Sequence, residues 1–110
     1  MSDKFIKKNY QMFMAGKLRT FDEVVLKPSK FNPNNPVLSH LEFDRIAKVL
    51  AKQLIEQPQM LTMEEVEFLR VTLKVPGDTI KDIINAKPYN LNHQKSHVLQ
   101  DLFRSFLAIG

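Results

Sequence analysis

The segment KPSKFNPNNP, residues 27–36, constrains the fold of this chain more than any other stretch. It holds three prolines and three asparagines in ten residues. Proline lacks the backbone N–H that helices and ladders need, and asparagine favours turns, so neither a helix nor a strand can run through the segment. We therefore expect residues 1–36 to form an N-terminal arm and residues 37–110 to form a helical core.

The arm is expected to be basic and loosely ordered, with one amphipathic helix before the Pro/Asn-rich loop. Residues 4–15, KFIKKNYQMFMA, place apolar side chains near one helical stripe, and Gly16 follows as a stop. This helix would dock onto the core, bind a membrane surface or bind a partner protein. The next piece, LRTFDEVVL, is β-branched enough for a strand, but we expect no second strand to pair with it and predict an irregular or extended segment.

The core reads as a series of capped helices. Ser39 and Glu42 have capping-box spacing and open a helix that should run to about Gln57. The same spacing recurs at Thr62 and Glu65, which predicts a helix from about Met63 to Lys74.

A short third helix is expected from Thr79 to Ala86, with Asp78 as a cap. From Asn90 onward an apolar stripe continues to the C-terminus as either one long helix or two short ones. The predicted fold class is all-α, with four to five helices.

Composition narrows the function classes. A chain of 110 residues that is 44% hydrophobic suits one compact domain. It has no cysteine, which removes disulfides and thiolate chemistry and is consistent with a cytoplasmic location. No apolar run approaches the roughly 18 residues of a membrane span, so we expect no transmembrane helix and no signal peptide.

Catalytic and metal-binding patterns are missing. The chain has only three glycines and shows no nucleophile elbow, phosphate loop or HExxH motif, so we predict a protein that is not an enzyme and carries no cofactor. His93, His97 and Asp101 are spaced i, i+4, i+8, but i and i+8 are about 12 Å apart along a helix and cannot share one ion. A site of two histidines completed by another chain is the alternative to a solvated helix face, and we predict no metal site.

Charge is uneven along the chain. Residues 1–30 hold seven Lys/Arg against three acids, residues 31–71 hold four against six, and residues 72–110 hold five against three. Both ends are basic and the middle is acidic. This distribution favours an anionic partner at the ends, of which nucleic acid is the first choice.

Residues 63–96 resemble the helix-turn-helix domains of the phage-repressor and Cro type. In that family a first helix ends in a Leu-Arg pair, and a positioning helix, a tight turn and a recognition helix follow. The positions that match this apolar skeleton are Leu69, Arg70, Leu73, Val75, Ile80, Ile84, Ala86 and Leu91. The chain departs from the pattern at Lys81, where the family has a small residue, and at Asn85, where it has glycine. The positioning helix, which usually starts with Ser-Gln, starts here with Pro76-Gly77, and the charge of Asp78 would repel phosphate.

The resemblance implies a small DNA-binding transcriptional regulator of repressor or antitoxin type. Its recognition helix would start near Tyr89 and present Asn90, Asn92, His93 and Gln94 to the major groove, with Lys87 and Lys95 on phosphates. Such regulators bind duplex DNA as homodimers. Here the arm or the C-terminal apolar stripe would supply the contact between the two copies.

The alternative is a non-enzymatic helical interaction module, such as an adaptor, chaperone or inhibitor, that binds a protein partner through residues 1–35. The path of residues 86–99 discriminates between the two functions. A bend near Ser96 would favour a reading head, and an unbroken helix from Leu91 to Ala108 would favour a packing element.

Overall fold

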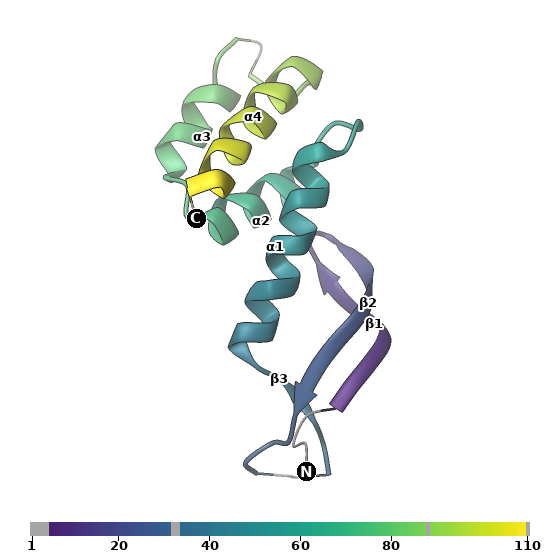
Figure 1. The fold of residues 1–110 in the computed structure, drawn as a ribbon. Coiled ribbons are helices and arrows are strands. Elements are labelled where there is room, and N and C mark those ends of the chain that lie inside the picture. Colours follow the sequence, from purple (N-terminus) through teal and green to yellow (C-terminus); the bar gives the residue numbers. More distant parts are fainter. Residues whose placement is uncertain (1–4, 32–33, 88, 110) are drawn as a thin grey trace. The chain divides into compact units, whose positions relative to one another are not determined.

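The fold combines a small antiparallel sheet with a set of helices (Figure 1). The computed structural model describes residues 5–31, 34–87 and 89–109. Within these residues the elements are β1 (Phe5–Met14), β2 (Lys17–Lys27), β3 (Val37–Leu38), α1 (His40–Glu56), α2 (Met63–Leu73), α3 (Gly77–Ile84) and α4 (His93–Ile109). The expectation of an all-α chain is wrong, because the N-terminal arm folds as strands.

The chain forms two compact units, residues 1–48 and residues 49–110. We call the first the sheet unit and the second the helical unit. The division falls inside α1, between Lys48 and Val49, so the first half of this helix belongs to the sheet unit and the second half to the helical unit.

Strands β1 and β2 form a long curved hairpin (Figure 1). Ala15 and Gly16 connect them, and their φ values of 54° and 86° are those of a two-residue type I′ turn. Arg19 steadies this turn, because its guanidinium donates to the backbone carbonyls of Met14 (3.1 Å) and Ala15 (3.2 Å). The predicted amphipathic helix over residues 4–15 is therefore wrong for all the residues described, and Lys4 lies outside them.

The segment that we expected to lack a partner strand is β2, and its partner is the arm itself. Tyr10 lies opposite Phe21, and Met12 lies opposite Arg19. The tight Ala-Gly turn brings the two segments into register. The ladder hydrogen bonds then stabilise the strands more than an isolated amphipathic helix would be stabilised, because such a helix depends on packing its apolar face.

The hairpin changes its buried face halfway along. Asn9 has a φ of 51° and is absent from the ladder, while the pairs on either side of it continue in register. Across this point the buried side chains of β2 shift from Phe21 to Val24, an odd spacing that alternation along a regular strand would not produce.

The start of α1 confirms the predicted helix boundary. The backbone N–H of Glu42 donates to the Ser39 hydroxyl (3.1 Å), and the helix runs from His40 to Glu56. The Glu42 carboxylate also accepts hydrogen bonds from the N–H of Val25 and from the guanidinium of Arg45.

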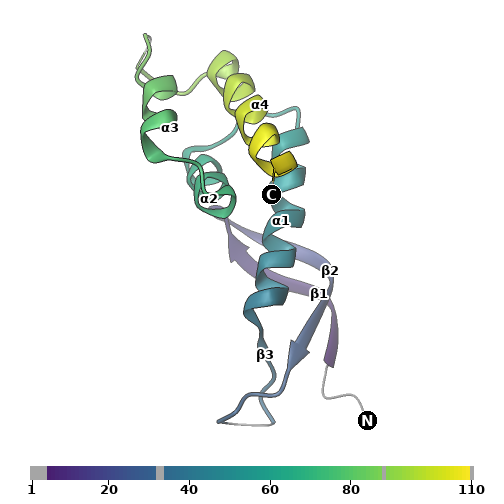
Figure 2. The same cartoon turned by 60° about the vertical axis from the view of Figure 1, so that its left-hand side comes forward.

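The predicted second helix is confirmed together with its cap. Thr62 and Glu65 form both hydrogen bonds of the capping box, and the helix ends at Lys74, which has a φ of 58°. Helix α3 (Figure 2) begins at Gly77 with Pro76 as its N-cap. Asp78 therefore lies inside the first turn and does not cap the helix.

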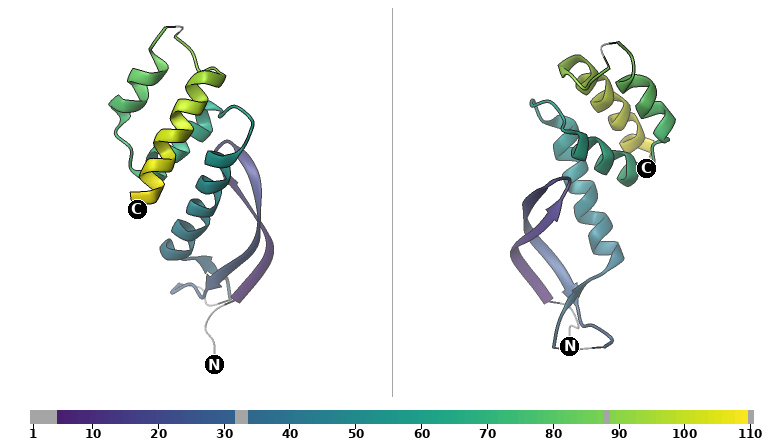
Figure 3. Two further views of the ribbon diagram at one scale, coloured as in Figure 1. Left: turned by 45° about the horizontal axis from the view of Figure 1, so that its top comes forward. Right: turned by 180° about the vertical axis from the view of Figure 1, so that it is seen from behind.

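Helix α4 contacts both α2 and α3 (Figure 3). Two of its buried polar side chains bind backbone groups more than 30 residues away in the sequence. The Ser96 hydroxyl accepts from the N–H of Leu61 (2.9 Å), and Gln100 Nε2 donates to the carbonyls of Leu54 (3.1 Å) and Gln57 (3.0 Å). The buried hydrophobic residues of the helical unit are Leu50, Ala51, Leu54, Ile55, Leu61, Val66, Leu69, Val75, Ile80, Leu99 and Phe103. Among the helices of the described ranges, none is long and apolar enough to cross a membrane.

Candidate functional site

Five of the seven predicted DNA-contacting residues lie together in the helical unit. Lys87, Tyr89 and Asn90 belong to the connection between α3 and α4, and His93 and Gln94 form the first turn of α4. All five side chains are exposed, and Tyr89 is 70% exposed. They precede or form the N-terminus of α4, where the partial positive charge of the helix dipole favours an anion.

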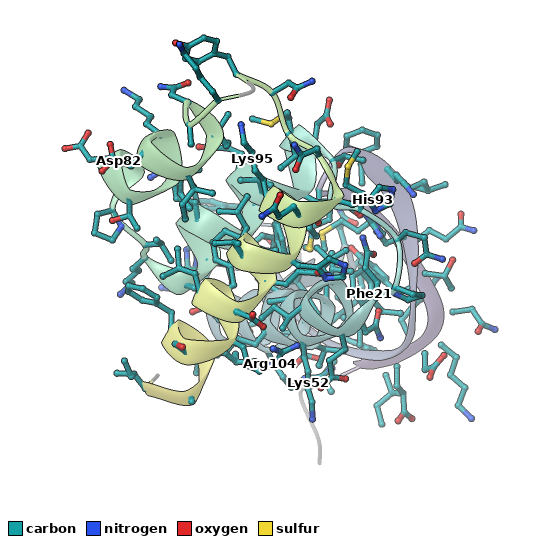
Figure 4. All side chains as sticks on the ribbon, turned by 90° about the horizontal axis from the view of Figure 1, so that it is seen from above. Phe21, Lys52, Asp82, His93, Lys95 and Arg104 are labelled. Atoms are coloured by element: carbon teal, nitrogen blue, oxygen red, sulfur yellow. The ribbon has the colours of Figure 1, made fainter. Side chains whose placement is uncertain are left out.

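The other two predicted residues stabilise the fold. Asn92 is the N-cap of α4, and its Oδ1 accepts from the N–H of Lys95 (2.9 Å). Lys95 is only 7% exposed, and its Nζ donates to the carbonyls of Ile84 (2.7 Å) and Ala86 (2.5 Å). Figure 4 shows this side chain directed from α4 toward the end of α3. A cation at that position offsets the negative end of the α3 dipole, so Lys95 is not placed to bind phosphate.

The backbone of the helical unit differs from that of a compact helix-turn-helix. Helix α4 is unbroken from His93 to Ile109, with no bend at Ser96, whose hydroxyl is buried. The connection between α3 and α4 spans the eight residues 85–92, whereas the reading motif uses a turn of about three or four residues. By the criterion set from the sequence, this path favours a packing element.

Net charge is divided unequally between the two units. The sheet unit holds nine Lys/Arg against five Asp/Glu, a net charge of +4, and the helical unit holds seven of each. The whole positive excess of the chain therefore belongs to the sheet unit. This charge distribution would attract an anion to the sheet unit rather than to the helical unit.

One edge of the sheet is closed by side chains. Strand β3 pairs only with Leu26 and Lys27, and beyond it the N–H of Val25 donates to Glu42 Oε2 (2.6 Å). Arg45 Nη2 donates to the carbonyl of Glu23 (3.0 Å) and also to Glu42 (2.9 Å). The hydrogen bonds to the Glu42 carboxylate raise the pKa of Arg45 above its usual value. Glu42 and Arg45 thus replace a neighbouring strand along this part of β2.

The opposite edge of the sheet is open within the described residues. The strand order is β1-β2-β3, so β1 has a neighbour on one side only. Lys7 and Lys8 lie on this edge strand, and both are exposed. Neither lysine forms an ion pair with a described residue.

The hairpin also exposes large apolar side chains. Phe13 and Leu18 lie directly opposite each other next to the turn and are 71% and 62% exposed. Ile6, nearer the other end of β1, is 65% exposed. The helix prediction placed Ile6 and Phe13 on one apolar stripe. The signal that could have revealed the hairpin is Ala15-Gly16 between two runs of residues able to form strands.

In the described part of the chain, no group of three or more His, Asp or Glu side chains is arranged to hold a metal ion. Comparisons with protein-family models, with curated proteins and with solved structures give no match. The function therefore has to be inferred from the chain's own residues and geometry.

Proposed function

We propose that this protein is a non-enzymatic interaction module that binds a protein partner through the hairpin of β1 and β2. The observation that carries the proposal is the exposed apolar pair Phe13 and Leu18. The two side chains are cross-strand neighbours, and each leaves more than half of its surface in water. Burial of such a pair against a partner gains about 25 cal/mol for each Å² of apolar surface removed from water.

The surroundings of this pair support a protein partner. Gln11 and Thr20, the next pair on the same face of the hairpin, are also exposed and uncharged, so they can form hydrogen bonds without a large desolvation cost. An apolar centre with a polar rim is the usual composition of a protein–protein contact. The chain has no cysteine, and the proposal assumes a reducing cytoplasmic location.

The test compares two aromatic residues of nearly equal exposure, Phe13 on the hairpin and Tyr89 in the helical unit, 71% and 70% exposed. The full chain and its Phe13→Ser and Tyr89→Ser variants are used as bait for cross-linking and mass spectrometry. A captured protein is then purified and titrated by calorimetry. We expect Phe13→Ser to weaken binding about tenfold or more, since an exposed aromatic anchor contributes more than about 1.4 kcal/mol.

Tyr89→Ser should leave the affinity within about twofold, because it changes a surface outside the hairpin. Equal affinities for the wild type and Phe13→Ser, or a loss of binding with Tyr89→Ser alone, would contradict a hairpin-mediated function. Circular dichroism and amide spectra of each variant establish that the hairpin and the helices are intact.

A second candidate is the DNA-binding regulator implied by the helix-turn-helix resemblance, acting as a homodimer. The observation that favours it is the exposed group of Lys87, Tyr89, Asn90, His93 and Gln94 at the N-terminus of α4. Against it stand the unbroken α4 and the neutral helical unit. Titration of non-specific duplex at several salt concentrations tests it, since each phosphate contact adds about 0.9 to the log–log slope. Binding that Lys87→Glu weakens and Lys8→Glu does not would favour this function over the first.

A further inference from the structure

The two edges of the sheet differ in how their backbone groups are satisfied. On the outer side of β2, strand β3 pairs with part of the edge. Next to it, the Glu42 carboxylate accepts from the N–H of Val25, and Arg45 donates to the carbonyl of Glu23. On the outer side of β1 no described residue plays the corresponding role. An open strand edge is a template for another strand, because its N–H and C=O groups are already aligned.

The register shows which residues of β1 direct their backbone groups outward. In an antiparallel pair, two residues that lie opposite each other both point their N–H and C=O groups either toward the other strand or away from it. Val25 and Glu23 point theirs away from β1, toward Glu42 and Arg45. Their partners in the ladder, Ile6 and Lys8, therefore direct their own N–H and C=O groups away from β2, along the open edge.

The side chains of this part of β1 select the charge of an added strand. Lys7 and Lys8 are both exposed, and the sheet unit carries a net charge of +4. A second copy of the same edge would bring two positively charged sheet units together, whereas an acidic segment would be attracted. A nucleic acid is also anionic, but it has no regular row of amide donors and acceptors to continue a ladder.

We infer that Phe5–Lys8 accepts an extended acidic segment of a partner protein as an additional strand beside β1. The backbone of that segment pairs with Ile6 and Lys8. Lys7 and Lys8 lie on opposite faces of the sheet, so carboxylates on one face of the segment meet the ammonium group of Lys7 or of Lys8. This inference rests on the proposed function and specifies how the hairpin binds its partner. Main-chain hydrogen bonds provide affinity in this mode of recognition, and the charges provide selectivity.

The probe is a fluorescein-labelled peptide of four Glu-Val repeats, titrated into the full chain and followed by anisotropy. A Lys-Val peptide of equal length tests charge. An acidic peptide with alternate backbone amides N-methylated tests the ladder, since it keeps every side chain and removes half of the main-chain donors. We expect binding of the acidic peptide, a loss of about tenfold or more on N-methylation, and no binding of the Lys-Val peptide.

Variants of the protein test the same contact from its other side. Ile6→Pro removes an outward N–H that β2 does not use, a position where proline is tolerated in edge strands, and Ile6→Ala is the matched control that keeps the amide. We expect Ile6→Pro to weaken binding about tenfold more than Ile6→Ala. The double change Lys7→Glu and Lys8→Glu should abolish binding of the acidic peptide.

Equal affinity of the plain and N-methylated peptides would overturn strand addition without requiring any variant. A captured partner whose affinity falls with Phe13→Ser but not with Ile6→Pro would also overturn it, and would leave the proposed function standing. If no hairpin variant weakens peptide binding or partner capture, strand addition and the proposed function are both overturned. Sedimentation that shows a dimer of the wild type and a monomer of Ile6→Pro would assign the edge to a second copy and overturn the acidic partner.

Discussion

Replacement of Lys95 by methionine tests whether this lysine is a structural residue. Its ammonium donates to the carbonyls of Ile84 and Ala86 at the end of α3, and the residue is 7% exposed. Methionine has a similar length and keeps the packing of the stem, so the change removes the charge and the hydrogen bonds of the ammonium group. Any loss of stability therefore reports on the contacts of this ammonium group, which include the two carbonyls.

The magnitude follows from three terms. Two hydrogen bonds from a charged donor contribute about 1.5–3 kcal/mol each. Removal of the ammonium from water costs roughly several kcal/mol, which offsets most of the stabilisation from the two hydrogen bonds. Ile84 is half-buried and Ala86 is exposed, so water can replace only part of what their carbonyls lose. We expect a net loss of about 2 kcal/mol, which lowers the urea midpoint by about 1 M for an m-value of about 2 kcal/mol/M.

The assay is equilibrium urea unfolding followed by circular dichroism, with Lys81→Met as the matched control. Lys81 lies on α3 and is exposed, so its replacement should change the free energy of unfolding by less than about 0.5 kcal/mol. The amide of Asn85, which donates to the carbonyl of Lys81 (2.8 Å), should also exchange faster in Lys95→Met. An unfolding free energy of Lys95→Met within about 0.5 kcal/mol of the wild type would refute the capping role.

Three further changes follow from the same geometry. Ser96→Ala leaves the N–H of Leu61 buried without its acceptor, so we expect the free energy of unfolding in urea to fall by about 1–3 kcal/mol. The exposed control Ser105→Ala should lower it by less than about 0.5 kcal/mol. Equal effects of the two changes would contradict this prediction. Ala15→Asn should stabilise the hairpin by about 0.5–1 kcal/mol, because asparagine adopts the positive φ of the turn at less cost, and a lower melting temperature would count against the type I′ assignment. The hydrogen bonds from Arg70 hold the pKa of Glu67 below its usual value. The small contribution of this exposed pair to stability is therefore present above the ordinary glutamate pKa and is lost as the pH falls through the lowered pKa of Glu67. Arg70→Met should raise the pKa of the Glu67 carboxyl, followed by NMR, back toward the ordinary value. An unchanged pKa would exclude Arg70 as the cause.

The helices of the core could be predicted because their boundaries depend on neighbouring residues. The capping box of Thr62 and Glu65 joins residues three positions apart, and Ser39 opens α1 in the same way. The hairpin could not be predicted from such signals. Residues 4–15 are compatible with a helical stripe, and they become a strand only because residues 17–27 fold back and pair with them.

The predicted site shows the same division. Five of the predicted contact residues are exposed, as expected for a polar loop and the first turn of a helix: Lys87, Tyr89, Asn90, His93 and Gln94. Lys95 and Ser96 follow them in sequence with equally polar side chains, yet both are buried. The neighbours that decide this are remote, since Ser96 binds a residue 35 positions away and Lys95 binds residues 9 and 11 positions away.

The sequence by itself determined the starts of α1 and α2, the break at residues 27–36 and the positive excess of the N-terminal part, because these depend on contacts within one turn or on composition alone. Only the tertiary structure decided that the arm is a hairpin, that Glu42 and Arg45 close one edge of the sheet, and that no described residue covers the edge of β1. These outcomes depend on backbone groups brought together from distant positions, such as Val25 and Glu42, 17 residues apart. A backbone N–H has the same chemistry in every residue, so only the fold determines which of them is left for a partner.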